Sequence, residues 1–377
     1  MRKVLVCFIL LLFLLPMEVA AEEVPQEEIQ AELFKQFEFS EIDKTLSDIF
    51  PNEKMGFLDT VMGLISGDLE FSFTLVKNFI RQQFIYELEY SKAGLIHILI
   101  LVIVAAVFSN FSSVFKSTQV SEISFFMLYM LLITICLDNF RVLTDSVLVN
   151  LEKLVEFMKL LGPIYFLAVG MATGSSTSLV FYQLVLLIIL LVEILIMSFL
   201  VPITQIYLMM RILGNFSADI PLSKFAEFLE TIVKWSLKTL TAGVIGFNVI
   251  QGLIHPAIDT VKRSLMLKGG EALPIIGNIV GGATEIVLGT AVLIKNGIGV
   301  AGMLICLMIC LVPTIQMAVT VLLYKFLAAL IQPISDKRMV NCVSSIADGT
   351  GLLLKIVITT GILFLLTIAI VATTTGG

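Results

Sequence analysis

A few charged and amide side chains stand inside strongly apolar stretches of the sequence, and these are the residues whose types could do chemistry. Glu193 is the single charge in its apolar stretch, Glu285 and Lys295 lie within or at the end of another, and Asn248 and Gln251 share one helical face. Placing an ionisable group at the centre of a bilayer costs at least about 2.5–3.5 kcal/mol on insertion scales. We therefore predict that these five residues either line a polar pathway or fix the packing of helices.

No set of residues with the spacing of an enzyme site is found. The sequence has no glycine-rich phosphate loop ending in Gly-Lys, which argues against ATPase activity in this chain. His97 and His255 have no cysteine or carboxylate at metal-ligand spacing, and Cys306 and Cys310 lie in an apolar run without further ligands. We predict no catalytic, cofactor-binding or metal-binding residue, and no enzymatic activity.

Two pairs of prolines mark an internal repeat with a constant offset of 111 residues. Pro163 matches Pro274 and Pro202 matches Pro313, within 12 identities over the 43 positions from 163 to 205. We predict repeat copies at about 125–213 and 236–324, in which the four prolines break helices. Interrupted helices in repeated halves are typical of transporters and channels. Chance agreement between Leu/Ile/Val-rich segments is the alternative, and parallel and inverted arrangements both stay open.

The composition decides the class of protein that must position these residues. Hydrophobic residues make up 58% of the 377, charged residues only 14%, and the mean hydropathy is +1.01, whereas soluble domains are about a quarter charged. A soluble globular enzyme is excluded. We expect an all-α protein with about eight transmembrane helices in residues 94–377. Amphipathic stretches at 141–161 and 222–240 are expected to be separate helices lying at the membrane surface or against a partner.

The N-terminal part has a different composition. Arg2 and Lys3, a short apolar run and small residues before Ala21 are typical of a signal peptide, residues 1–21, cleaved after Ala21. A first membrane helix is the alternative. Residues 22–93 carry a net charge of −9, from fifteen acidic and six basic side chains, which argues against nucleic acid as a partner. We expect them to form a helical region outside the cytoplasm.

Within this region, Ser40 followed by Asp43 suggests the start of a helix. Phe34, Phe37 and Phe39 precede it. We expect these aromatic side chains to pack the small region, and a surface for a partner is the second interpretation.

Several short segments, each weak alone, together resemble one family. They are 65–72 before the first span, 120–123 before the second, 138–140 after it, 273–277, 292–297 with Gly299, and Tyr324-Lys325 followed by 328–333. In these segments the chain resembles the stage III sporulation protein AE family of endospore-forming bacteria, over nearly all of its length after residue 21.

The resemblance implies a multi-pass subunit of the assembly that connects mother cell and forespore after engulfment. Such a protein would be made in the mother cell and inserted in the outer forespore membrane. Its partners would be the lipid bilayer, other stage III sporulation proteins of the same group and stage II sporulation protein Q. The assembly resembles a secretion-like channel needed for late forespore gene expression and forespore integrity. The family implies no catalytic residues.

Two alternatives belong to other functional classes. A stand-alone secondary transporter or permease would also suit the repeat, the broken helices and Glu193. A structural scaffold would tolerate neutral residues at Glu193 and Lys295 but would fail without residues 22–93.

Overall fold

A computed structural model describes residues 26–50, 56–67, 69–114, 118–173, 175–216, 222–270 and 277–374. The predicted signal peptide with Ala21, and Pro274, lie outside these residues. Asn248, Gln251 and Glu285 lie in described helices, but their side chains are outside the described part of the structure.

Apart from short connections, the described residues are helical, and they include no strand, as the all-α prediction requires. The helices are α2 (Gln26–Phe34), α3 (Ser40–Ile49), α4 (Phe57–Ile65), α5 (Leu69–Val114), α6 (Thr118–Thr173), α7 (Ser175–Leu191), the π-helix η1 (Val192–Leu200), α8 (Val201–Phe216), α9 (Ser223–Gly270), α10 (Gly277–Ile331) and α11 (Lys337–Thr374).

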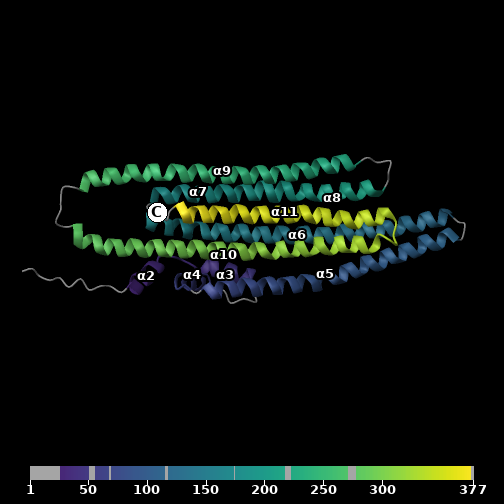
Figure 1. Cartoon of the computed structure of the whole chain (residues 1–377), viewed down its shortest axis with the longest axis horizontal. Coiled ribbons are helices and arrows are strands. Elements are labelled where there is room, and N and C mark those ends of the chain that lie inside the picture. Colours follow the sequence, from purple (N-terminus) through teal and green to yellow (C-terminus); the bar gives the residue numbers. More distant parts are fainter. Residues whose placement is uncertain are drawn as a thin grey trace, which may run out of the picture.

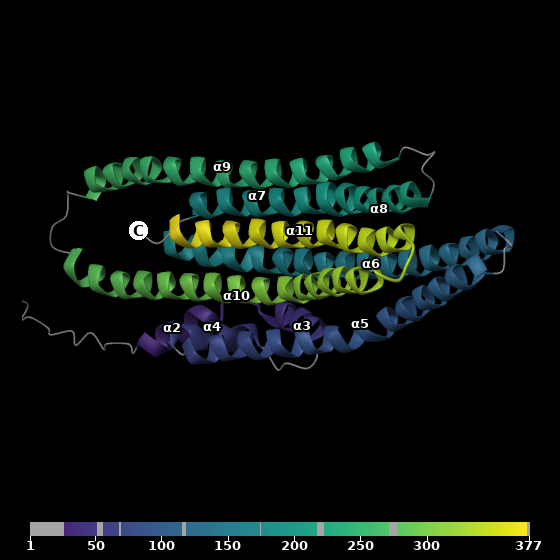
Figure 2. The ribbon, with the colours of Figure 1, turned by 45° about the vertical axis from the view of Figure 1, so that its right-hand side comes forward.

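The long helices form an elongated bundle in which successive elements run in opposite directions (Figure 1). α7, η1 and α8 follow one another as a single rod. α10 lies against α5, α6 and α11, whereas α9 lies at the outer edge and contacts α8 and α11 (Figure 2). α5 begins and α11 ends at the same end of the bundle. From the start of α5 to the end of α11, the chain therefore runs along the bundle an even number of times.

Five helical segments of the described residues are long and apolar enough to cross a bilayer, fewer than the eight expected. They are Lys77–Val107, Ile123–Ala172, Tyr182–Asn215, Val287–Ile331 and Lys337–Ala369. The count is lower because apolar blocks that look separate in sequence are joined into single helices of up to 56 residues. Such a helix is about 84 Å long, well beyond a hydrocarbon core of about 30 Å, so parts of it extend past one membrane thickness.

The amphipathic stretches do not form separate helices. Residues 141–161 lie in the middle of α6, and 222–240 fall almost entirely in the first half of α9. The proposed boundary at residue 94 lies inside α5. Gly94, Gly162, Pro163 and Gly243 stand at or near these junctions, yet α5, α6 and α9 continue through them.

The prolines also differ from the expected helix breaks. Pro163 lies inside α6 and Pro313 inside α10, while Pro202 is the second residue of α8. A proline removes one hydrogen bond of a helix, and neighbouring helices and side chains compensate for that loss in membrane bundles.

Helix ends do not coincide at the 111-residue offset. Thr173 ends α6, but its match Thr284 lies inside α10. The repeat therefore remains a prediction from the sequence.

The small helices α2, α3 and α4 lie along the side of the bundle. Ser40 begins α3 as predicted, but the Asp43 carboxylate accepts a hydrogen bond from the Phe57 amide at 2.6 Å instead of capping its own helix. Phe34, Phe37 and Phe39 are buried and their rings contact one another. The rings of Phe37 and Phe39 are stacked, and Phe39 also contacts Phe57. These aromatic side chains therefore pack the small region.

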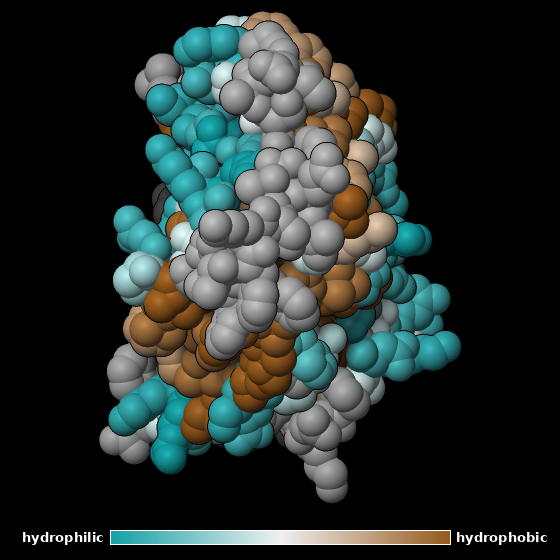
Figure 3. Space-filling view, turned by 90° about the vertical axis from the view of Figure 1, so that its right-hand side faces the viewer, coloured by the Kyte–Doolittle hydropathy of each residue, from teal (hydrophilic) through white to brown (hydrophobic). Residues whose placement is uncertain are grey.

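Large apolar side chains reach the surface of the long helices. Ile100, Met127, Leu322 and Phe326 are each more than half exposed, and apolar surface lies beside polar surface in the end view (Figure 3). Exposed apolar surface on this scale marks contact with a membrane or a partner, as expected for a multi-pass membrane protein.

Oxidation is expected to cross-link α6 to α11. Cys136 of α6 and Cys342 of α11 are both buried, and they are neighbours where the two helices pack together. After treatment of membranes with a permeant oxidant, we expect the peptides that contain these residues to be joined in mass spectra, because a disulfide forms only between thiols that lie close together. The Cys342→Ser variant is the control, and absence of the joined peptide in the wild type would contradict this packing.

Candidate functional site

Glu193 lies at the start of the π-helix and pairs with another helix. Its carboxylate accepts a hydrogen bond from the Lys159 ammonium of α6 at 2.5 Å. The exposed fractions of the two side chains are 39% and 50%. The pair is therefore an accessible ion pair that joins α6 to η1.

The local backbone explains why this segment is not α-helical. The Ser198 hydroxyl donates to the Glu193 carbonyl oxygen at 3.0 Å, five residues back. Pro202 lies two residues after the end of the π-helix and cannot donate an amide hydrogen bond to the preceding turn. A π-helical turn widens the helix at such a position, and these turns occur often at functional sites.

Lys159 also borders the N-terminal region. It lines a cavity of about 340 Å³ between the α2–α3 connection, α3 and α6, together with Glu38, Glu41 and Pro163. From the sequence, Glu38 and Glu41 were expected in a separate N-terminal region. In the structure they line the same cavity as Lys159, the partner of Glu193.

Lys295 is fully buried in α10. Two residues further, Gly297 lies so close to α4 that a Cβ atom there would be 2.8 Å from the Ile65 side chain and 3.2 Å from Val61. Lys295 therefore stands at the level where the N-terminal region contacts the bundle.

A second group of polar side chains ties four helices together. Asp348 of α11 accepts hydrogen bonds from Arg211 of α8 at 3.2 Å and from Lys325 of α10 at 2.7 Å. Lys325 also donates to the Ser344 hydroxyl at 3.2 Å. One carboxylate thus binds two cations from two different helices.

Neutral hydrogen bonds extend this group. Asn215 donates to Ser345 at 3.1 Å, Asn139 to Tyr324 at 3.1 Å, and Ser146 to Gln316 at 2.8 Å. We call the whole set the polar layer: Asn139, Ser146, Arg211, Asn215, Gln316, Tyr324, Lys325, Ser344, Ser345 and Asp348.

The polar layer carries more positive than negative charge. Arg211 and Lys325 face the single carboxylate of Asp348, and the Arg211 guanidinium lies 6.0 Å from the Tyr207 ring centre. Interhelical hydrogen bonds in membrane proteins average about 0.6 kcal/mol each. Because several such interactions occur together, we infer that the polar layer fixes the relative positions of α6, α8, α10 and α11.

The sequence-based candidates and the structure agree only in part. Glu193 was identified from its isolation in an apolar stretch, and the same signal applies to Arg211 and Asp348, which were missed. The family-like segments do come together: Asn139 bonds Tyr324, and Ile65 contacts the site of Gly297.

In the described ranges no group of three or more histidine, cysteine or acidic side chains is placed to hold a metal ion.

These features define the class: a multi-pass helical membrane protein whose long helices are joined by ion pairs and hydrogen bonds. The family model of stage III sporulation protein AE matches residues 55–375, so the chain belongs to that family. Stage III sporulation protein AE of Bacillus subtilis (strain 168) is 21% identical over 277 residues, which is 73% of this chain and 69% of that protein. No solved structure matches.

Proposed function

We propose that this protein is a membrane subunit of the secretion-like channel complex that joins mother cell and forespore during endospore formation. Membership of the family is the observation that carries the proposal, since the family match covers α4 to α11. The sporulation family does not favour a stand-alone transporter.

The proposed location is the outer forespore membrane, with residues 22–93 facing the space between the two forespore membranes. The proposed partners are the other stage III sporulation proteins of the same group and stage II sporulation protein Q. The contact of α4 with α10 supports this arrangement, because a partner that binds the N-terminal region would act directly on the membrane bundle.

The protein is proposed to act without catalysis. The proposed roles of Glu193 and Lys295, and of Asn248, Gln251 and Glu285, are helix packing or the lining of a pathway. Energy would come from a companion subunit.

Deletion of the gene in its own host tests the proposal. We expect normal vegetative growth, arrest after engulfment, and forespores that shrink, measured by fluorescence microscopy of stained membranes. Complementation with the intact gene is the control. Normal spores together with altered solute uptake would contradict the proposal and support a transporter.

The Glu193 pair gives a residue-level prediction. Neutralising it in Glu193→Gln is expected to reduce the number of heat-resistant spores, while protein abundance changes little because an exposed ion pair contributes only up to about 1 kcal/mol. The exchange Glu193→Lys with Lys159→Glu is expected to restore spore formation. Full spore formation by Glu193→Gln would show that the charge has no role.

A further inference from the structure

Exposed side chains repeat along the rod of α7, η1 and α8 with an offset of 19 residues. Three pairs at this offset are each 43–60% exposed: Leu187 and Ile206, Leu190 and Met209, Ile194 and Leu213. Buried side chains follow the same offset: Val185 and Thr204, Ile188 and Tyr207, Ile189 and Leu208. Five turns of an α-helix take 18 residues. The rod therefore holds one residue more than an α-helix that presents the same face outward.

The additional residue is held in η1. The Val201 amide donates a hydrogen bond to the Ile196 carbonyl oxygen, five residues back, and the Ser198 hydroxyl donates to the Glu193 carbonyl oxygen. A backbone hydrogen bond that spans five residues encloses one residue more than the α-helical bond that spans four. If η1 became α-helical with the same residues, α7 and α8 would turn by about 100° relative to each other.

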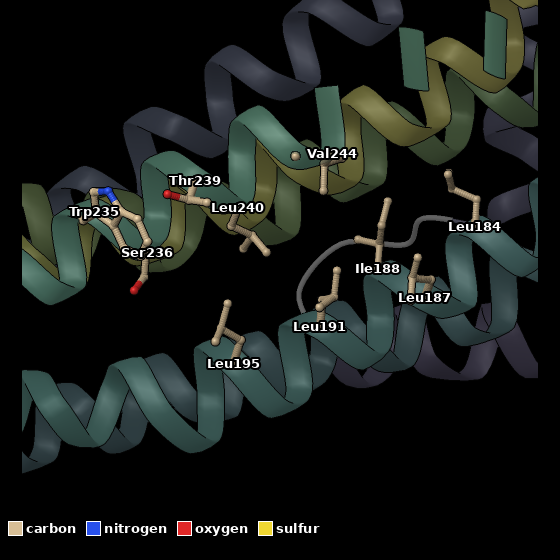
Figure 4. Close-up of a pocket in the computed structure, with 11 residues that line it drawn as sticks. Leu184, Leu187, Ile188, Leu191, Leu195, Trp235, Ser236, Thr239, Leu240 and Val244 are labelled. Carbon is tan, nitrogen blue, oxygen red and sulfur yellow. The ribbon is translucent and has the colours of Figure 1, made fainter. Parts of the chain in front are cut away.

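Packing fixes the orientation of α7 less firmly than that of α8. Every side chain from Leu184 to Leu191 is apolar, so a turn of about 100° replaces one apolar face against α6 by another. α7 packs mainly against α6, whereas α8 packs against both α9 and α11. On the side toward α9, α7 borders an open apolar groove of about 440 Å³ (Figure 4). We therefore expect α7 to be the half of the rod that turns.

The Glu193–Lys159 ion pair supplies an orientation that apolar packing does not. α7 has no acidic or basic residue, and Glu193 is the first charge after it. The Glu193 carboxylate lies 2.5 Å from the Lys159 ammonium of α6. A turn of about 100° would carry this carboxylate away from α6, so the ion pair and the π-helix depend on each other.

We propose that η1 is a conformational joint. The Glu193–Lys159 pair holds it in the π form, and opening of the pair lets η1 become α-helical while α7 turns about its axis against α6. Lys159 also lines the cavity next to Glu38 and Glu41, so the joint lies where the N-terminal region meets the bundle. This inference does not depend on the proposed function.

Two cysteine pairs report on the two halves of the rod. A Cβ at Gly162 of α6 would lie 3.8 Å from the Val185 side chain of α7, and a Cβ at Gly349 of α11 would lie 3.5 Å from the Leu208 Cβ of α8. Contacts this close allow a disulfide. Gly162→Cys with Val185→Cys therefore reports on α7, and Gly349→Cys with Leu208→Cys reports on α8. Each full-length variant is oxidised in membranes, and the joined peptides are measured by mass spectrometry.

We expect both pairs to cross-link when Glu193 is present. With Glu193→Gln the α6–α7 cross-link is expected to fall at least threefold, because Val185 turns away from position 162, while the α8–α11 cross-link is retained. Deletion of Phe199, an exposed residue of η1, removes the additional residue. The shortened rod is then α-helical with α7 and α8 in their present orientations. The α6–α7 cross-link is therefore expected to return even with Glu193→Gln.

Glu227→Gln is the control, because it removes an exposed charge of α9 and is expected to leave both cross-links unchanged. Three outcomes would overturn the proposal. They are an unchanged α6–α7 cross-link in Glu193→Gln, loss of both cross-links in that variant, and a Phe199 deletion that folds without restoring the α6–α7 cross-link. The first comparison needs no deletion, so the test stands even if the shortened protein fails to fold.

Discussion

The Asp348→Asn variant is expected to lose about 1–3 kcal/mol of its free energy of unfolding and most of its spore formation. Without the carboxylate, Arg211 of α8 and Lys325 of α10 both lose the counter-charge that they share. Breaking a fully buried ion pair costs about 3–5 kcal/mol, but these side chains are 31–50% exposed, and water screens part of the loss. Thermal unfolding in detergent and counts of heat-resistant spores measure the effect.

Two further variants separate this effect from a general loss of charge. Glu227→Gln removes one partner of an exposed pair within α9, with Lys224 84% exposed, and is expected to unfold like the wild type. Asp348→Glu keeps the charge and is expected to retain most of the stability. If Asp348→Asn unfolds like Glu227→Gln, the polar layer does not fix the helices.

Replacing Gly297 by leucine is expected to detach the N-terminal region from the bundle and to abolish spore formation. The first added carbon would lie 2.8 Å from Ile65 and 3.2 Å from Val61, and overpacking of this kind typically costs about 1–3 kcal/mol. The contact would open because α4 is a short helix that is held to α10 mainly by packing. Limited proteolysis of membranes measures the detachment as faster cleavage in residues 26–67.

The same helix provides the control. Gly289 lies in α10 with nothing within 4 Å of an added Cβ, so Gly289→Leu is expected to behave like the wild type. The second change Ile65→Ala makes room for leucine at position 297 and is expected to restore both protease resistance and spores. Equal cleavage of Gly297→Leu and Gly289→Leu would contradict the role of this contact.

Composition and periodicity predicted the helical membrane class because those properties are local. Helix ends were predicted less well. The amphipathic stretch 141–161 and the apolar residues before it belong to one helix, since the polar residues between them, Asp138 and Asn139, are compatible with an α-helix. Pro163 and Pro313 would be expected to end an isolated helix, but here each lies inside a continuous helix.

The sequence predicted a residue of the candidate site only where that residue was unusual by itself, as a charge in an apolar stretch. Glu193 stood alone in its apolar stretch. The partner of a charge depends on which helices become neighbours, and Lys159 and Glu193 are 34 residues apart. Arg211 and Asp348 are 137 apart, so only the fold could bring them together. The contact of Gly297 with Ile65 could not be predicted either, because the sequence around a glycine does not indicate which distant residue will pack against it.

The contact between α4 and α10 has a consequence for the order of synthesis. Ile65 leaves the ribosome long before Gly297, and translation at about 5–20 residues per second separates them by roughly 12–46 seconds. During that interval the surface of α4 that will cover α10 has no partner in its own chain. The N-terminal region is therefore synthesised early but can contact α10 only after residue 297 has been made. A chaperone or an assembly partner has its best access to this region while the rest of the chain is still being inserted.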